Sequence, residues 1–305
     1  MDAAIGRLQW PFIGACACMT DKPLVSAACD LCGCDEHKVL FRKRDTTSYW
    51  LARCAEDTSL DPSTEFPIVE CARCRHVFVT PRLSPELIAD IYARFWRSYK
   101  PQALPQDPFA YHLCRHLAKF SEFGKLLDFG CGWGQYLGAA KAVGWDAIGI
   151  EIDPEKIEFA RSQGLNAVQG ELLDGIFDSE TFDAVIAQQV FEHLYDPVSY
   201  IEEIRRVLKP GGVLFVSVPN YGSVLARFAG ANWDMVSPVA HVRYFTSGTL
   251  KQLLSDHGFE VLSKRYVRRF ENNLLKDMAY QASVVFENVF QIYPRTALSL
   301  YACKA

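Results

Sequence analysis

The feature that most restricts the possible folds of this chain is a glycine-rich turn that joins a short apolar run to an amphipathic stretch. Residues 125–129 form the apolar run, Gly130, Gly132 and Gly134 lie in the turn, and residues 136–143 have the apolar spacing of a helix. Glycines adopt positive φ and let a ligand approach the backbone closely. A dinucleotide fingerprint would need its third glycine where Gln135 stands. The turn therefore predicts a site for a nucleotide-like ligand without a pyrophosphate.

Beyond this turn, short apolar runs alternate with amphipathic stretches. Such alternation predicts right-handed crossovers and a mostly parallel sheet with helices on both faces. The predicted fold class is therefore α/β, with ligands bound at the carboxyl ends of the strands. The predicted strands are residues 125–129, 147–150, 166–169, 182–187 and 213–218, and the predicted helices are residues 136–143, 154–162 and 197–208.

An acidic residue, Glu151, ends the second predicted strand. It follows the first glycine of the turn by about 20 residues, the spacing at which a carboxylate meets the hydroxyls of a ribose. Each charge-assisted hydrogen bond to such a ligand would contribute about 1.5–3 kcal/mol. Glu151 alone could be a solvated strand end, but together with the glycine turn it indicates a ribose-binding acid.

These features resemble the class I S-adenosylmethionine-dependent methyltransferases, from about residue 115 to the C-terminus. Residues 127–134 match the first motif of that family, and residues 149–153 match its ribose-binding acid. Residues 182–194 match the fourth strand with its following loop, and residues 208–220 match the approach to the fifth strand. The resemblance implies a Rossmann-like sheet of seven strands and S-adenosyl-L-methionine as cofactor.

The resemblance also implies where the cofactor lies. Gln169, Gly170 and Glu171 are expected near the adenine, and Gln188 and Gln189 near the methionine half. The implied cofactor-binding residues are Asp128, Gly130, Gly132, Gly134, Glu151, Ile152, Gly170, Glu171, Gln188 and Gln189.

The family usually ends in an antiparallel hairpin, which residues 259–262 and 297–301 can supply. Between them, residues 272–292 have a helical pattern that a minimal domain of this family lacks. We expect an inserted helix there, which covers the site or forms an oligomer contact. A monomer and a homodimer both remain open.

Two C-x-x-C pairs, Cys29 with Cys32 and Cys71 with Cys74, lie in the N-terminal third. Four thiolates suit a tetrahedral structural Zn²⁺, and two pairs in one small module favour a metal over a redox centre. Short strands at residues 66–70 and 77–80 would hold the second pair, as in a zinc-ribbon-like module. The alternative ligands are Cys34 and Cys54, whereas Cys16 and Cys18 have no assigned role.

A cysteine module ahead of this core is similar to a bacterial subfamily that includes sugar C-methyltransferases and other small-molecule methyltransferases. In those C-methyltransferases, an acidic residue precedes a histidine in the loop after the fifth strand. Here His241 is present, but Ala240 replaces the acid, which weakens the case for a sugar.

Two histidines are candidates for the general base, because histidine titrates near neutrality. His241 is the first candidate and His193 the second, although His193 could instead cap the turn that precedes Pro197. Three aromatic residues of the same long loop could shape an acceptor pocket or pack on the surface, namely Tyr221, Trp233 and Tyr244.

Composition narrows the partners and the compartment. The net charge is −4, so the chain has no electrostatic footprint for nucleic acid. No stretch approaches the roughly 20 apolar residues of a membrane helix. The 11 cysteines are an odd number and cluster in metal-type pairs, which predicts a reducing, cytoplasmic compartment. A weak lipoprotein-like motif at residues 13–16 leaves export as the alternative.

We expect an enzyme that acts on a small-molecule acceptor. We also expect the chain to be divided into four regions. Residues 1–26 are an irregular lead-in, 27–82 the zinc-binding module, 83–123 a helical linker and 124–305 the methyltransferase domain. The alternatives are a nucleic-acid-modifying enzyme that uses the module as a reader, and a non-catalytic scaffold that binds S-adenosylmethionine. The first lacks the N/D-P-P-Y/F tetrad after the fourth strand, and the intact glycine turn disfavours the second.

Overall fold

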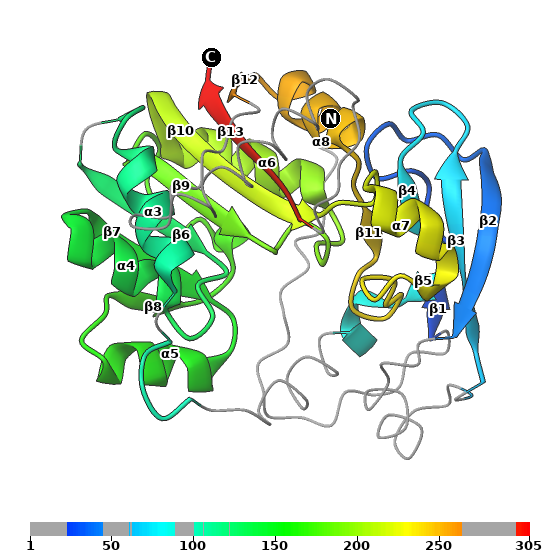
Figure 1. Cartoon of the computed structure of the whole chain (residues 1–305), viewed down its shortest axis with the longest axis horizontal. Coiled ribbons are helices and arrows are strands. Elements are labelled where there is room, and N and C mark those ends of the chain that lie inside the picture. The colour runs from blue at the N-terminus through cyan, green and yellow to red at the C-terminus, as the bar shows by residue number, and fades with distance from the viewer. Residues whose placement is uncertain are drawn as a thin grey trace, which may run out of the picture.

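The computed structural model describes residues 23–44, 61, 63–88, 101–105, 107–121, 123–263 and 297–305. These residues form a large sheet covered by helices and a smaller β-module beside it (Figure 1). The inserted helix predicted at residues 272–292 lies outside the described residues, as do most of the lead-in and Cys16, Cys18 and Cys54.

The large sheet has seven strands in the order β12-β13-β10-β9-β6-β7-β8, which confirms the predicted α/β fold. The five strands from β10 to β8 are parallel, and β13 is antiparallel to both β10 and β12. The predicted C-terminal hairpin is therefore confirmed. The strands are β6 (Lys125–Phe129), β7 (Asp146–Glu151), β8 (Ala167–Gln169), β9 (Phe182–Gln188), β10 (Leu208–Pro219), β12 (Phe259–Ser263) and β13 (Ala297–Lys304).

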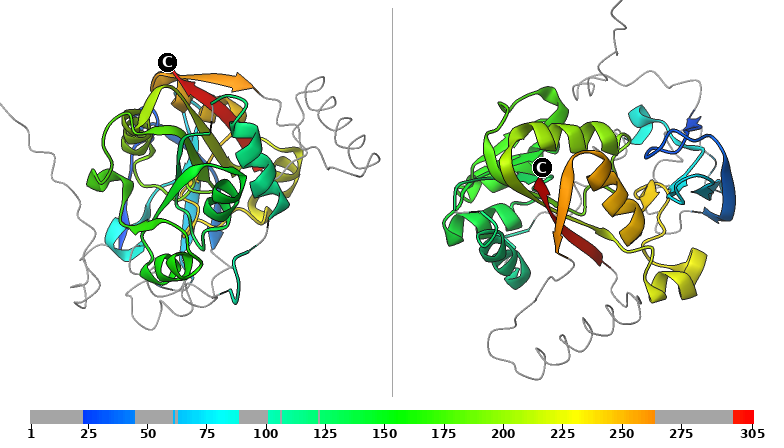
Figure 2. Two further views of the ribbon diagram at one scale, coloured as in Figure 1. Left: turned by 90° about the vertical axis from the view of Figure 1, so that its left-hand side faces the viewer. Right: turned by 90° about the horizontal axis from the view of Figure 1, so that it is seen from above.

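Helices cover both faces of this sheet (Figure 2). On one face, buried side chains of α3 (Pro108–Leu117), α4 (Gln135–Val143) and α5 (Pro154–Ser162) form a core with the strands. On the other face, α6 (Pro197–Val207) and α8 (Ser247–Asp256) do the same. Each layer buries the apolar side of amphipathic helices, which is the dominant stabilising term for such a fold.

Local sequence sets where three of these helices begin. Asp107, Asp153 and Asp196 are the N-caps of α3, α5 and α6, and each side chain accepts a backbone N–H of the first turn. Each is followed by a proline, whose fixed φ suits the first helical position. The Asp-Pro pairs therefore fix the amino ends of α5 and α6 at the predicted residues.

Helix α3 stops short of residue 123, where the predicted helical linker ends. It ends at Leu117, and the chain then makes tight turns, with the N–H of Lys119 bonded to the carbonyl of His116 and that of Phe120 to the carbonyl of Leu117. The turns redirect the chain so that it can enter β6, which begins at Lys125.

The order of the strands creates one point where the connections diverge. The chain runs from β6 to β7 and β8 on one side, and then returns to place β9 and β10 on the other side of β6. The loops after β6 and β9 therefore meet at one edge of the sheet. In open α/β sheets, this switch point is where ligands bind.

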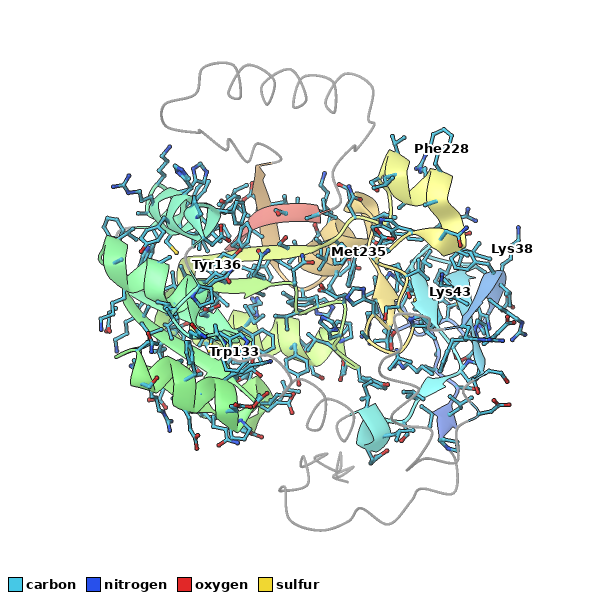
Figure 3. All side chains as sticks on the ribbon, turned by 60° about the horizontal axis from the view of Figure 1, so that its bottom comes forward. Lys38, Lys43, Trp133, Tyr136, Phe228 and Met235 are labelled. Atoms are coloured by element: carbon cyan, nitrogen blue, oxygen red, sulfur yellow. The ribbon has the colours of Figure 1, made fainter. Side chains whose placement is uncertain are left out.

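The smaller module is a four-stranded antiparallel sheet in the order β11-β4-β3-β2. Strands β2 (His37–Arg44), β3 (Glu65–Cys71) and β4 (Val77–Val79) come from the N-terminal third, whereas β11 (Arg243–Tyr244) comes from the loop after β10. A further pair, β1 (Leu24–Val25) and β5 (Arg82–Leu83), lies beside it. Figure 3 shows Lys38 and Lys43 on the outer edge of this module and Phe228 on the outside of α7 (Val224–Ala229).

Among the helices of the described residues, none has the length and apolar character needed to cross a membrane.

Candidate active site

The glycine turn lies at the switch point and has the backbone that its sequence predicts. Gly130, Gly132 and Gly134 have φ of 72°, 52° and 89°. A Cβ on Gly130 would lie 2.7 Å from Cγ2 of Val190 in the loop after β9, so this position needs glycine for close packing. A Cβ on Gly132 would meet no atom within 4 Å. Gly132 therefore borders open space, as a ligand-facing position should.

Glu151 lies beside this turn at the end of β7. Its Oε2 accepts the N–H of Gly132 at 3.0 Å, and its Oε1 accepts the N–H groups of Ile152 and Asp153 at 3.0 and 3.1 Å. Oε2 has room for a further hydrogen bond, because it carries two lone pairs and accepts one N–H within the protein. The backbone thus holds the carboxylate at the glycine turn, where the hydroxyls of a ribose can reach it.

Two other predicted cofactor residues are buried acceptors. Asp128 is buried in β6, and burial raises the pKa of its carboxyl to about 7. Its Oδ2 and the Oε1 of Gln188 are buried without a hydrogen-bond partner among the described residues. Unpaired buried acceptors are unfavourable and indicate a missing donor, such as a ligand or a water. Gln188 ends β9, so its oxygen lies at the ligand-binding edge of the sheet.

Gln169, Gly170 and Glu171, which are expected near the adenine, lie at the end of β8. Ile152, another predicted cofactor-binding residue, directly follows β7. Ile152 is 40% exposed, which leaves an apolar surface next to Glu151. The N–H of Gly170 donates to the backbone carbonyl of Glu151 at 3.1 Å. The carboxyl of Glu171 accepts the hydroxyl of Tyr200 and caps the short 3-10 turn η2 (Leu172–Asp174), and burial raises its pKa to about 7. Glu171 is thus already engaged within the protein.

Gln189 has a left-handed backbone, with φ of 54°. Its N–H donates to the carbonyl of Ser217 at 2.8 Å, and its side-chain amide donates to the hydroxyl of Ser217 at 3.3 Å. These bonds tie the loop after β9 to β10. We infer that Gln189 shapes this loop, because its amide nitrogen is directed at Ser217.

The structure brings the two candidate bases, His193 and His241, together from distant parts of the sequence. Ala240, the residue before His241, lies 47 residues after His193. The imidazole centroids of His193 and His241 lie 4.9 Å apart, at 60°. Nδ1 of His193 is 2.7 Å from the carbonyl of Ala240, and Nδ1 of His241 is 2.8 Å from the carbonyl of Met235. A carbonyl only accepts, so each Nδ1 carries a proton, and each ring in its neutral form presents Nε2 as an acceptor.

Glu192 completes this cluster, and the sequence did not single it out. Its Oε1 lies 3.9 Å from Nε2 of His193, and one ligand atom of each of Glu192, His193 and His241 lies within 4.8 Å of the others. Burial raises the pKa of the Glu192 carboxyl to about 8, whereas burial and the neighbouring His241 lower the pKa of His193. Burial thus favours the neutral form of both Glu192 and His193. The only sequence signal for Glu192 is its place beside His193.

The four predicted metal ligands form a compact group. Sγ of Cys29 is 3.4 Å from Sγ of Cys74, Sγ of Cys32 is 3.5 Å from Sγ of Cys71, and all four lie within 4.8 Å of one another. A tetrahedral site with Zn–S bonds of about 2.3 Å places sulfurs slightly under 4 Å apart. The closest contacts join one C-x-x-C pair to the other, which fits a shared metal ion rather than two redox pairs.

Backbone amides support a thiolate at Cys71, whereas burial raises the pKa values of Cys29 and Cys74. Burial acts to raise the pKa of Cys71, but the N–H groups of Cys74 and Arg73 outweigh it and lower that pKa to about 7. A metal ligand needs the thiolate form. Cys34, an alternative ligand from the sequence, is not in the group, and its thiol donates to the carbonyl of Glu36.

The three aromatic residues predicted to shape an acceptor pocket pack against the module. Trp233 and Tyr244 are only 3% and 1% exposed, and both belong to an apolar cluster with Phe66 and Ile68 of β3. Tyr221 is half-buried, with its ring 5.7 Å from that of Tyr244. Trp233 and Tyr244 thus form the core between the module and the loop after β10.

Comparisons with known proteins agree with this geometry. Residues 85–264 match the sequence profile of the family described as "Methyltransferase domain". A "Probable S-adenosylmethionine-dependent methyltransferase" of Mycolicibacterium smegmatis is 31% identical over 45% of this chain and 52% of its own length. A "Ubiquinone biosynthesis O-methyltransferase" of Cereibacter sphaeroides is 34% identical over 36% of this chain and 48% of its own. This chain thus spans about half the length of the curated relatives it matches.

Among solved structures, a SAM-dependent methyltransferase from Archaeoglobus fulgidus is 20% identical. The match covers 64% of this chain and 93% of that one, with a TM-score of 0.47.

Proposed function

The chain belongs to the methyltransferase-domain family, and we propose that it transfers a methyl group from S-adenosyl-L-methionine to a small-molecule acceptor in a biosynthetic pathway. The observation that carries this proposal is the Glu151 carboxylate held at the N–H of Gly132, beside a glycine turn that borders open space. The named relatives include O-methyltransferases, so an acceptor hydroxyl is the first chemistry to test.

The residues at the switch point fit this cofactor. Glu151 would accept hydrogen bonds from the ribose hydroxyls, and the exposed face of Ile152 would cover the adenine. The unpartnered Oε1 of Gln188 would accept a donor from the amino group of the methionine half. When bound, the cofactor supplies an electrophilic methyl group on a positively charged sulfur.

We assign the histidine pair, His193 and His241, to the side of the site where the acceptor binds, called the acceptor side below. An acceptor hydroxyl that attacks the methyl carbon must lose its proton, while the carbon–sulfur bond breaks and the sulfur leaves as a neutral thioether. We infer that Nε2 of His241 takes this proton, because its Nδ1 is committed to the Met235 carbonyl. His193, with a lowered pKa, would stay neutral beside it and orient the acceptor. Alignment of donor and acceptor supplies much of the remaining rate enhancement.

We also infer that Cys29, Cys32, Cys71 and Cys74 hold a structural Zn²⁺. The distances between their sulfurs and the lowered pKa of Cys71 support this assignment. The ion would close the module and take no part in methyl transfer.

Calorimetric titration with S-adenosylmethionine tests the cofactor site. Glu151→Ala should weaken binding about 10- to 100-fold, because it removes a charged acceptor of two hydroxyls. Glu158→Ala, on the exposed side of α5, should leave binding unchanged and serves as the matched control. Absence of binding by the unmodified protein, or full affinity in Glu151→Ala, would overturn the proposal.

Incubation with methyl-labelled S-adenosylmethionine and a panel of phenols, catechols and nucleotide-linked deoxysugars would identify the acceptor class. His241→Ala should then lower turnover by about 10²–10⁴ without changing cofactor affinity. Near-normal turnover of His241→Ala would remove it from the mechanism.

A further inference from the structure

A buried charge cluster lies between the cysteine group and the histidine pair. Asp30 stands within the first C-x-x-C pair, and its carboxylate accepts two hydrogen bonds from Arg82, at 3.0 Å each. Nη2 of Arg243 lies 3.1 Å from the same carboxylate. The side chains of Asp30, Arg82 and Arg243 are only 8%, 6% and 0% exposed.

Both arginines also donate hydrogen bonds to one backbone carbonyl, that of Tyr195 in the loop between β9 and α6. Nη2 of Arg243 donates to the carbonyl of Tyr195 at 2.6 Å, and Nη2 of Arg82 donates to it at 3.3 Å. The guanidinium of Arg82 lies 4.6 Å from the centre of the Tyr195 ring, and the hydroxyl of Tyr195 donates to the carbonyl of Leu83. Tyr195 is therefore fixed by the module on its backbone, its ring and its hydroxyl.

Tyr195 and Arg243 each lie two residues after one of the paired histidines, His193 and His241. The two segments are also bonded to each other, because the N–H of Val242 donates to the carbonyl of Glu192 at 3.0 Å. Positions of Tyr195 and Arg243 thus set the positions of both imidazoles.

The charges of this cluster make Asp30 its critical member. Two guanidinium groups share one carboxylate, so the buried cluster carries a net positive charge. Arg243 has two further nitrogens, and Arg82 one, without a hydrogen-bond partner among the described residues. Removal of the single carboxylate would leave two like charges buried side by side, which is strongly unfavourable. The segments that carry the arginines and Tyr195 would then rearrange.

We propose that Asp30 is a positioning residue that couples the four-cysteine group to the histidine pair, through Arg82, Arg243 and the carbonyl of Tyr195. The backbone of Asp30 is fixed by its neighbours Cys29 and Cys32 when their sulfurs share a metal ion. A change in metal binding by the cysteine group would therefore alter the positions of His193 and His241. The role of those histidines in catalysis rests on the proposed function, whereas the coupling itself is a structural claim.

Hydrogen exchange measured by mass spectrometry on the full chain tests the coupling. Asp30→Asn keeps the size of the side chain and removes its charge. It should speed exchange of residues 190–196 and 238–245 by about tenfold or more, while metal content and S-adenosylmethionine affinity stay unchanged. The imidazole ¹⁵N signals of His193 and His241 should shift as well. Unchanged exchange and unchanged signals in a metal-loaded Asp30→Asn protein would overturn the proposal.

Two further variants keep the test decisive. Glu70→Gln removes another ion pair of the module, to Arg75, which is 74% exposed, and should leave both segments protected. Arg82→Lys keeps the charge but loses the forked geometry that bonds Asp30 and Tyr195 together. If Asp30→Asn loses its metal, the result for Arg82→Lys is used instead. Faster hydrogen exchange of residues 190–196 and 238–245 in Arg82→Lys supports the coupling, and full protection of both segments refutes it. Failure of the unmodified protein to bind S-adenosylmethionine would contradict the proposed function but not the coupling.

Discussion

The proposed cofactor side and the proposed acceptor side of this protein are assembled in different ways. On the cofactor side, the glycine turn and Glu151 follow two adjacent strands and are bonded directly, from the N–H of Gly132 to the carboxylate. On the proposed acceptor side, His193 and His241 come from different loops. Arg82 of the N-terminal third bonds Asp30 and also the carbonyl of Tyr195, two residues after His193. The first site is local in sequence, whereas the second needs contacts between distant segments.

The two sides also differ in what stabilises them. The cofactor side rests on backbone conformation, with positive φ at its glycines and amides bonded to one carboxylate. The proposed acceptor side rests on buried charge and on the four-cysteine group beside it. Damage to one side should therefore leave the other largely intact, and the first prediction below tests that independence. The two that follow test what stabilises each side by itself.

The largest effect is expected from Cys71→Ala. Structural Zn²⁺ sites contribute about 10–16 kcal/mol in small peptides, so loss of one thiolate should abolish metal binding and unfold the module. Metal analysis and thermal unfolding would measure the loss, and S-adenosylmethionine affinity should stay within about threefold because the glycine turn does not depend on the module. Cys34→Ala, outside the sulfur group, should keep the metal. Retention of metal by Cys71→Ala would refute the assignment.

A smaller and pH-dependent effect is expected from Glu192→Gln. The folded pKa of Glu192 is about 8, raised by burial from 4.5, so folding binds a proton between those values and stability falls as pH rises through them. The variant lacks this loss and should exceed the unmodified protein by on the order of 4 kcal/mol at pH 9. The difference should shrink to near zero at about pH 4.5.

Chemical denaturation at a series of pH values would measure this difference. Glu158→Gln, on the exposed side of α5, should show the pH dependence of the unmodified protein. Parallel stability curves for Glu192→Gln and the unmodified protein would contradict the raised pKa.

The smallest effect concerns two glycines on the cofactor side. Gly130 and Gly175 both have left-handed backbones, with φ of 72° and 70°, but a Cβ meets Val190 at 2.7 Å only at Gly130. Gly175→Ala should cost about 1 kcal/mol through its φ alone, and Gly130→Ala about 2–3 kcal/mol. Urea unfolding would compare them. Equal costs would show that packing of the turn against the loop after β9 contributes nothing.

The sequence predicts the local geometry around the glycine turn, because the signals for that geometry are short-range. The Asp-Pro pairs begin α5 and α6 at the predicted residues, and the ends of β6 and β7 place the glycine turn beside Glu151. The tight turns after Leu117, which shorten α3, gave no comparable signal.

The acceptor side was predicted only in part. His193 and His241 were named as candidates, but Glu192, β11 and the partners of Asp30 were not. Asp30 and Arg82 lie 52 residues apart, and neither has a local pattern that requires the other. Aromatic character alone also could not show that Trp233 and Tyr244 are buried between the module and the loop.

Strand β11 has a consequence for how this protein is made. It pairs with β4 and supplies the fourth strand of the module's sheet, yet it leaves the ribosome about 170 residues after Cys74. Chain synthesis adds about 5–20 residues per second, so β11 is made roughly 10–30 s after the four cysteines. During this interval the nascent module has an open edge at β4, which is a site for aggregation. Synthesis of the four cysteines and closure of the module's sheet are therefore separate events in time.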